Sequence, residues 1–191
     1  MNIKRCCEDQ KFENVNYSGE KVPCAEYVGC VFENCDFSNS NLSNIKFIDC
    51  EFHLCNLSLA NLNAASLKTV KFFESKLVGL DFSNCSEFLF SVIFEKCNLQ
   101  YASFFKRKLH KTTFKDCSLN ETIFSEVDLS LSVFLNCDLI NAIFEKTILS
   151  KVDFTTSYNY IIDPEKNNIK KAKFSKDGIL GLLAKYDIMI E

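Results

Sequence analysis

Tryptophan is absent from the 191-residue chain, and proline, histidine and glycine are scarce, with two, two and five residues. So few turn-forming residues argue against an ordinary β-sandwich, whose many tight turns need glycine and proline. Two histidines also leave little for a histidine-based metal or catalytic site. No stretch approaches the roughly 18 apolar residues of a membrane span, and the first residues lack the apolar centre of a signal peptide. We therefore expect a cytoplasmic protein.

Acidic and basic residues nearly balance, at 25 and 22, which gives a formal net charge of −3. This charge argues against a protein that binds nucleic acid through bulk electrostatic attraction. The abundant residues are phenylalanine and cysteine, with 19 and 11 copies, within an apolar fraction of 47%. That composition is typical of a globular protein rather than a disordered one.

Apolar residues recur at every fifth position along most of the chain. One series runs from Phe12 to Phe82, and after a shift of two residues a second series runs from Leu89 to Phe154. All 29 positions of the two series are apolar, and 14 of them are phenylalanine and 12 leucine. A period of five fits neither an α-helix nor an ordinary strand, so the chain has to turn about every five residues.

A longer period, four times as long, accompanies the period of five. One set of small residues lies two positions before apolar residues of the series. Their spacings are 20, 20, 22, 20 and 20: Cys35, Cys55, Ser75, Cys97, Cys117 and Cys137. One set of phenylalanines also has a single step of 22: Phe12, Phe32, Phe52, Phe72, Phe94, Phe114, Phe134, Phe154 and Phe174. Four repeats in each coil therefore predict a four-sided, all-β solenoid with a two-residue bulge at one corner.

The solenoid is predicted to span residues 10–174, with residues 1–9 as an N-terminal extension and the bulge near residues 83–88. Coils stacked at the spacing of β-strands, about 4.8 Å, give about eight coils and a rod roughly 40 Å long. Large inward side chains have to alternate with small ones, because so narrow a coil encloses little space. Residues 155–168 are a candidate loop, and residues 175–191 follow the last repeat.

The repeats resemble those of the pentapeptide-repeat family, whose consensus is Ala-(Asp/Asn)-Leu followed by two variable residues. The clearest matches are Ala60-Asn61-Leu62, Cys97-Asn98-Leu99, Val127-Asp128-Leu129, Cys137-Asp138-Leu139 and Val152-Asp153-Phe154. The resemblance covers about residues 10–174. It implies that the solenoid is a right-handed quadrilateral β-helix with a short C-terminal α-helix.

The tail narrows the resemblance to one subgroup. The stretches 163–174 and 178–190 look like the ending of topoisomerase-protecting members, which include quinolone-resistance proteins and immunity proteins against albicidin and microcin-type gyrase poisons. This resemblance implies a DNA mimic that binds DNA gyrase or topoisomerase IV and protects it from quinolones or toxins. It also implies a homodimer formed through the C-terminus. The alternative is a non-enzymatic interaction or structural solenoid with a different protein partner.

Acidic residues spaced by one coil are the candidate DNA-mimic residues. On the wall of Phe12 and its equivalents, here named the Phe wall, they are Glu13, Glu33, Glu51, Glu74, Glu95 and Asp116. Four lysines dilute the negative charge of this wall: Lys11, Lys71, Lys96 and Lys115. On the wall of Phe37 and its equivalents from Leu57 to Leu139, here named the Leu wall, they are Asp36, Glu121 and Asp138, with Lys76 as the opposing charge. Any polar solenoid surface also needs solvated charge, so the sequence leaves both interpretations open.

No convergent polar site points to an enzyme, and no cofactor or metal is expected. Seven cysteines at small inward positions are interpreted as core residues: Cys30, Cys35, Cys50, Cys55, Cys97, Cys117 and Cys137. Four cysteines fall outside this ladder, and in the cytosol all eleven are expected to stay reduced: Cys6, Cys7, Cys24 and Cys85.

Arg107 occupies a small inward position, where a buried, unpaired guanidinium is costly. Either the coil distorts locally or the side chain escapes to solvent. Its basic neighbours favour a solvated surface patch over a partner site: Lys106, Lys108, His110 and Lys111.

The open end of a solenoid exposes core residues and backbone edges, and both must be covered. Ser175 is the predicted N-cap of a C-terminal helix whose apolar stripe can cap the last coil. The candidate cap or dimer residues are Ile179, Leu180, Leu182, Leu183, Tyr186, Ile188, Met189 and Ile190. One coil end is too small to bury all of them, so we predict a two-fold dimer in which this segment is exchanged or paired.

Overall fold

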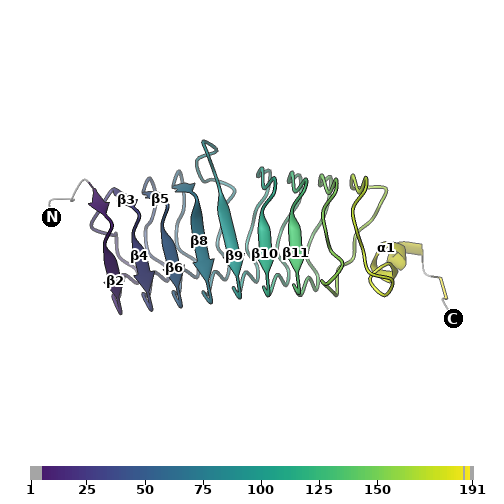
Figure 1. Cartoon of the computed structure of the whole chain (residues 1–191), viewed down its shortest axis with the longest axis horizontal. Helices are drawn as coiled ribbons and strands as arrows, with labels where there is room; N and C mark the ends of the chain where they lie inside the picture. Colours follow the sequence, from purple (N-terminus) through teal and green to yellow (C-terminus); the bar gives the residue numbers. More distant parts are fainter. Residues whose placement is uncertain (1–5, 187, 190–191) are drawn as a thin grey trace.

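The computed structural model describes residues 6–186, 188 and 189, which form a straight rod (Figure 1). Short strands lie side by side along the rod, and one short helix follows at its C-terminal end (Figure 1). Within the described residues, no helix has the length and apolar character needed to cross a lipid bilayer.

Two parallel sheets run along the rod. The longer sheet has the strand order β11-β10-β9-β8-β6-β4-β2. Its strands are β2 (Lys11–Glu13), β4 (Val31–Glu33), β6 (Glu51–His53), β8 (Val70–Phe73), β9 (Val92–Glu95), β10 (Thr113–Lys115) and β11 (Val133–Leu135). The shorter sheet has the order β1-β3-β5-β7. Its strands are β1 (Cys7–Glu8), β3 (Glu26–Val28), β5 (Lys46–Ile48) and β7 (Ser66–Lys68).

The strand register follows the spacing of the sequence repeats. Phe12 lies beside Phe32 at the regular spacing of the repeat, whereas Phe72 lies beside Phe94 across the one longer step. Isolated parallel bridges continue the same register beyond β11 as far as Lys173. The predicted parallel solenoid with one insertion is therefore confirmed.

The rings of the Phe wall stack along the rod axis. Nine rings from Phe12 to Phe174 make eight successive stacked pairs, with ring centroids 4.7–5.6 Å apart. Rings of an adjoining wall meet them edge to face, as where Phe104 and Phe124 approach Phe114 at 5.9 Å. The seven rings between the two ends of the stack are at most 1% exposed, so they form a large part of the hydrophobic core.

Small side chains fill the inward positions between the rings, and many of them contact the preceding coil. The thiol of Cys55 lies 3.4 Å from the carbonyl oxygen of Phe32, and Cys137 repeats this contact with Phe114. Burial raises the pKa of the Cys55 thiol to about 12, so the thiol is protonated and poorly nucleophilic at neutral pH. All seven cysteines assigned to inward positions are buried.

Three cysteines that the sequence register placed outside the ladder are also buried, so that prediction is wrong. Cys7 pairs with Tyr27 in the shorter sheet, because the stack begins earlier than the apolar series indicates. The thiol of Cys85 lies 3.7 Å from the carbonyl oxygen of Leu62, inside the coil. Cys24 is buried and forms a disulfide with Cys7, which contradicts the expectation that every cysteine stays reduced.

The corners of the coil use left-handed backbone conformations, although glycine is rare. Among the described residues, twenty-six other than glycine have positive φ angles, including Asn34 at 51° and Leu54 at 54°. Asparagine adopts this region readily, whereas a leucine pays a steric cost there. Repeated left-handed corners therefore replace the glycine and proline turns that the sequence lacks.

Replacing Leu54 by Asn is expected to raise the free energy of unfolding by about 0.5–1 kcal/mol, because asparagine fits a positive φ better. The leucine side chain is 54% exposed, so little apolar burial is lost. The new amide also extends a row in which Asn34 already donates to the Asn14 side chain at 2.7 Å. Urea unfolding of the two proteins measures the change, and a less stable variant contradicts the explanation.

The insertion between β8 and β9 interrupts the regular hydrogen bonding at one corner. The Ser86 N–H donates to Ala65, but the Ser91 N–H donates to Leu67. The two donors, Ser86 and Ser91, are five residues apart, whereas the two acceptors, Ala65 and Leu67, are two residues apart. The coil that contains the insertion is therefore longer at this corner than the coil before it. Residues 86–91 leave the regular path at this point and return to it at β9.

The structure overturns the assignment of Leu89 to the interior. Leu89 is 64% exposed, whereas Phe90 packs against the core and meets the ring of Phe82 edge to face at 6.4 Å. The two residues are adjacent and both apolar, so the period of five cannot distinguish them. The looped path of residues 86–91 turns Phe90 inward instead.

The last part of the chain leaves the solenoid through a turn and a short helix, α1 (Leu180–Leu183), followed by a 3-10 turn, η1 (Ala184–Tyr186). Ser175 is not the N-cap of this helix, because the helix begins later, after Ile179. The Ser175 hydroxyl instead accepts a hydrogen bond from the Gly178 N–H at 2.9 Å and holds the preceding turn.

Residues 155–168 stay in contact with the coil before them. Tyr158 pairs with Asp138, and Asn168 pairs with Ile148, both in parallel bridges. The segment therefore begins and ends in the register of the stack.

Candidate interaction surfaces

Most acids of the Phe wall are paired with lysines. The ion pairs are Lys11 with Glu13 and Glu33, Lys71 with Glu51, Lys96 with Glu74, and Lys115 with Glu95. Asp116 accepts a hydrogen bond from the Asn136 amide at 3.1 Å. The paired ammonium groups offset the negative charge of this wall, so it imitates a row of phosphates poorly.

The acids of the Leu wall have a different environment. Within the described residues, Asp36, Glu121 and Asp138 take part in no ion pair. Asp36 accepts a hydrogen bond from the Ser38 N–H at 2.8 Å, and Asp138 accepts one from the Asn159 amide at 2.8 Å. Both donors are neutral, so neither hydrogen bond offsets the negative charge of Asp36 or Asp138.

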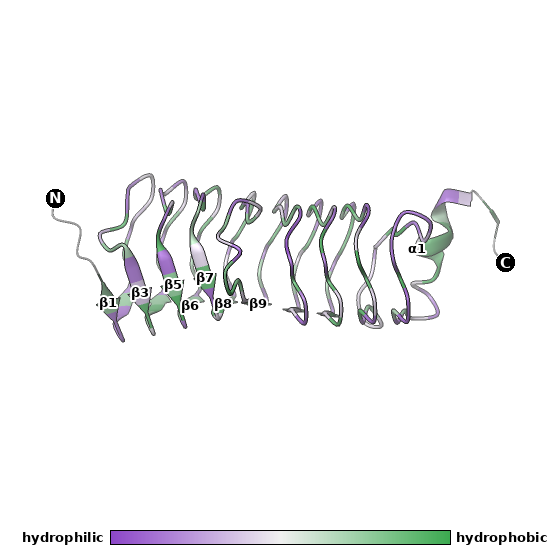
Figure 2. Cartoon of the chain, turned by 90° about the horizontal axis from the view of Figure 1, so that it is seen from above, coloured by the Kyte–Doolittle hydropathy of each residue, from purple (hydrophilic) through white to green (hydrophobic). Residues whose placement is uncertain are grey.

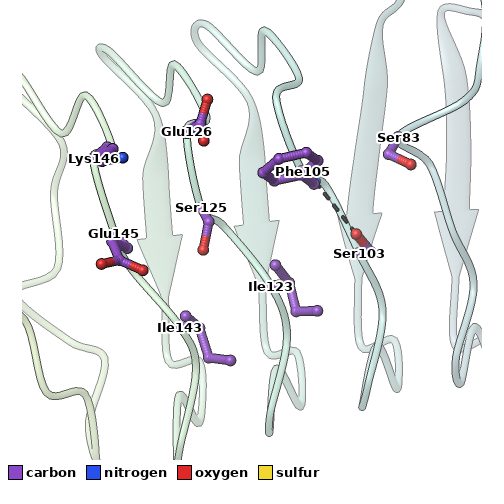
Figure 3. A pocket seen from close by; sticks show the side chains of 9 residues that line it. All are labelled: Ser83, Ser103, Phe105, Ile123, Ser125, Glu126, Ile143, Glu145 and Lys146. Carbon is purple, nitrogen blue, oxygen red and sulfur yellow. Dashed lines mark hydrogen bonds between the residues drawn. The ribbon is translucent and has the colours of Figure 1, made fainter.

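A shallow groove of about 520 Å³ lies outside a third wall, whose stacked rings include Phe104 and Phe124. Figure 3 shows Ile123 and Ile143 on successive coils, with Phe105 on the coil before them. Phe105 is 37% exposed and Ile143 46% exposed, so the groove offers apolar surface to a partner. The sequence analysis missed this groove, although the isoleucines stand one coil apart at outward positions.

Arg107 lies inside the rod with 4% of its surface exposed. Its Nη1 donates to the Cys85 carbonyl at 2.8 Å, and its Nη2 donates to the Ser86 carbonyl at 3.1 Å. The guanidinium carbon stands 4.2 Å from the centroid of the Phe90 ring. The first alternative for Arg107, a local distortion of the coil, is therefore the one that the structure shows. Residues at the insertion supply both the carbonyls and the ring that hold the side chain.

The C-terminal helix buries only part of its apolar surface against the last coil. Leu182 is 9% exposed, and the helix appears as a hydrophobic segment in Figure 2. The other candidate cap residues with large exposed fractions, between 49% and 96%, are Ile179, Leu180, Tyr186, Ile188 and Met189. Leu183 is half-buried, and Ile190 lies outside the described residues.

The helix is also tied to the last coil by polar contacts. The Gly181 carbonyl accepts a hydrogen bond from the Ile162 N–H at 3.1 Å. Lys185 Nζ lies 2.7 Å from Asp163 and 2.6 Å from Glu165. The orientation of the helix is therefore fixed, and its exposed apolar side chains face away from the coil.

The described residues form no candidate metal site. Among the residues that the structure describes, no three His, Cys, Asp or Glu side chains are grouped as metal ligands.

A family model described as "Pentapeptide repeat region" matches residues 25–88 and 87–158. No curated protein sequence matched the chain. Among solved structures, a trypsin-treated variant of QnrB1, described as a plasmid-mediated fluoroquinolone resistance protein, has a TM-score of 0.54 and 22% identity. The likeness covers 95% of this chain and 100% of that one.

Two further solved structures are similar over nearly the whole chain. A second trypsin-treated QnrB1 variant has a TM-score of 0.49 and 23% identity over 98% of each chain. HetL of the cyanobacterium Nostoc, a pentapeptide repeat protein described as involved in heterocyst differentiation regulation, has a TM-score of 0.38 and 16% identity, covering 91% and 90%. Because the family model matches most of the coils and the strands have the predicted register, the chain belongs to the pentapeptide-repeat family and folds as its quadrilateral β-helix.

Proposed function

We propose that the chain is a non-enzymatic solenoid that binds DNA gyrase or topoisomerase IV and protects the enzyme from quinolones or gyrase-directed toxins. The observation that carries this proposal is the end-to-end likeness to QnrB1, which is described as a fluoroquinolone resistance protein. The likeness includes the rod and the tail, because it covers 95% of this chain and all of that one. The rod is straight, and its likeness spans the whole QnrB1 chain. Such a rod suits a partner that binds duplex DNA.

The Leu wall is the best candidate for the topoisomerase contact. Its carboxylates Asp36, Glu121 and Asp138 form no ion pair with a lysine within the described residues, although Lys76 stands on the same wall. Most acids of the Phe wall do form such pairs. Three carboxylates are far fewer than the phosphates of a duplex of the same length, which carries a charge about every 1.7 Å. Recognition therefore rests on the shape of the rod, with a few charges that set its orientation.

Neutralising these three acids is expected to weaken protection. The variant Asp36→Asn, Glu121→Gln, Asp138→Asn keeps the side-chain shapes and the acceptor oxygens but removes the charges. We expect the protein concentration that restores half of gyrase supercoiling in the presence of a quinolone to rise roughly tenfold.

The control variant carries Glu13→Gln, Glu33→Gln and Glu95→Gln on the Phe wall. We expect it to protect within about twofold of the unmodified protein, because lysines already offset those charges. Equal losses in the two triple variants would contradict the choice of wall. The proposed function itself is wrong if the unmodified protein neither restores supercoiling nor retains gyrase in a pull-down.

The alternative is a solenoid that binds a different protein partner without acting on a topoisomerase. The groove with Phe105, Ile123 and Ile143 favours it, because exposed apolar side chains in a row are typical of protein interfaces rather than of a phosphate mimic. Replacing Ile143 by Ser distinguishes the two functions. It should leave gyrase protection unchanged if the Leu wall makes the contact, and abolish partner capture if the groove does.

A further inference from the structure

A second cavity, of about 190 Å³, lies beside the inserted corner. Its lining residues are Glu87, Leu89, Phe90, Lys106, Arg107 and Lys108. The volume is several times the share of one water molecule in the liquid, about 30 Å³, so a small ion with an attached group has room to enter. Three side chains of the lining are cationic and one is a carboxylate, which leaves an excess of two positive charges.

Arg107 carries its positive charge inside the rod, and among the described residues no carboxylate is hydrogen-bonded to its guanidinium. Two of the five N–H donors of the guanidinium bond to the backbone carbonyls of Cys85 and Ser86. Nε of Arg107 has no hydrogen-bond partner within the described residues. Burial lowers the pKa of Arg107, but a guanidinium stays charged at neutral pH. The carbonyls and the Phe90 ring are neutral, and Arg107 forms no ion pair among residues 6–186, so of the lining residues only the nearby Glu87 carboxylate opposes its charge.

The two flanking lysines add to this excess. Lys106 and Lys108 are exposed, and both line the cavity. Lys106 lies 3.7 Å from Glu126, whereas Lys108 is in no ion pair among residues 6–186. Cations crowded around a partly desolvated guanidinium repel one another, and an anion that binds between them removes this repulsion.

We propose that this cavity binds a phosphate-type dianion. Two negative charges match those of Arg107 and Lys108, neither of which forms an ion pair among residues 6–186. The unused guanidinium donors and the Lys108 ammonium supply the charge-assisted hydrogen bonds that phosphate oxygens accept. Leu89 and Phe90 offer apolar contact to a small organic group, so both inorganic phosphate and an organic phosphate monoester fit the lining. The site requires no topoisomerase and is independent of the function proposed above.

Titration calorimetry of the full-length protein tests this site, at constant ionic strength held with sodium chloride. The probes are inorganic phosphate and phenyl phosphate, and we expect saturable binding of one anion per chain. Tighter binding of phenyl phosphate identifies a phosphate carried by an organic molecule, because its ring can contact Leu89 and Phe90. Equal affinities identify free phosphate as the ligand. Absence of saturable binding by both probes overturns the proposal.

Lys108→Ala is expected to weaken phosphate binding roughly tenfold, the usual effect of one lost charge-assisted hydrogen bond. Lys111→Ala is the matched control, because it removes the same charge from the same coil but from a residue outside the cavity lining. We expect its affinity to stay within about twofold. Equal affinities of the two variants overturn the proposal.

Arg107→Met tests the buried charge directly. Methionine keeps an unbranched side chain against Phe90 but removes the guanidinium, so binding of both probes should disappear. Circular dichroism of the variant establishes whether the rod still folds. If it does not fold, the comparison of Lys108→Ala with Lys111→Ala decides the proposal alone, since both side chains are exposed.

Discussion

Replacing Phe114 by Ala is expected to lower the free energy of unfolding by about 3–5 kcal/mol. The ring is fully buried and stacks between Phe94 and Phe134, with centroids 5.2 and 4.8 Å away. The strands on both sides hold it in register, so the walls cannot close over the missing ring. Thermal unfolding should show a melting temperature lower by roughly 10 °C or more.

Lys115→Ala is the matched control for this prediction. Lys115 follows Phe114 directly, but its side chain is 45% exposed and its partner is the surface residue Glu95. An exposed ion pair contributes little, so the expected loss is about 0.5 kcal/mol or less. Similar melting temperatures for the two variants would show that the inside and outside of the coil have been assigned wrongly.

The fold is readable from the sequence because one geometric unit repeats. Each coil must bury a residue such as Phe52 or Phe114 and expose its neighbours, and this requirement is the same in every coil. The single longer step between Phe72 and Phe94 located the insertion correctly. Errors such as Leu89 occur where the repeat is broken, because periodicity carries no information about an irregular path.

The surface charges were less predictable than the core. Counting acids along a wall suggested a phosphate-like row, but the charge of each acid depends on the residue one coil away. The sequence contains that signal, since Lys71 stands one coil after Glu51 and Lys115 stands one coil after Glu95. The sequence therefore shows that lysines dilute the acids of the Phe wall, but the individual ion pairs come from the structure.

The contacts of Arg107 and Cys7 could not be deduced from spacing alone. Arg107 is buried because the inserted residues present two carbonyls and a ring to it, and those positions depend on the path of the loop. The disulfide of Cys7 depends on Cys24 pointing inward, at a place where the period of five predicts an outward residue.

We propose that the chain forms a two-fold dimer through its C-terminal segment, so deleting residues 176–191 is expected to yield monomers, aggregates or both. The deleted segment contains Leu182, which is buried, and Gly181, whose carbonyl accepts from Ile162 in the last coil. Without it, the open end of the solenoid exposes core residues and unpaired backbone groups to other chains. Light scattering of both proteins at micromolar concentration measures the change in mass.

A point variant tests whether the helix must be docked on the last coil, or whether its presence in the chain is enough. A side chain at Gly181 collides with the backbone carbonyl of Tyr160, which cannot move cheaply because it belongs to the last coil. Gly181→Ala should therefore displace the helix and destabilise the protein by about 1–3 kcal/mol, the usual cost of overpacking. Lys176→Ala, at an exposed position of the same segment, should have no measurable effect on mass or stability.

The dimer is proposed because docking leaves apolar surface uncovered. Leu182 covers the last coil, but Ile179, Leu180 and Tyr186 remain about half exposed although the helix is fixed in place. Side chains of this kind in the last segment of each chain can cover one another across a two-fold axis, which closes the assembly at two subunits. A mass of one chain for the intact protein, or an unchanged dimer after deletion of residues 176–191, would place the interface elsewhere or remove it.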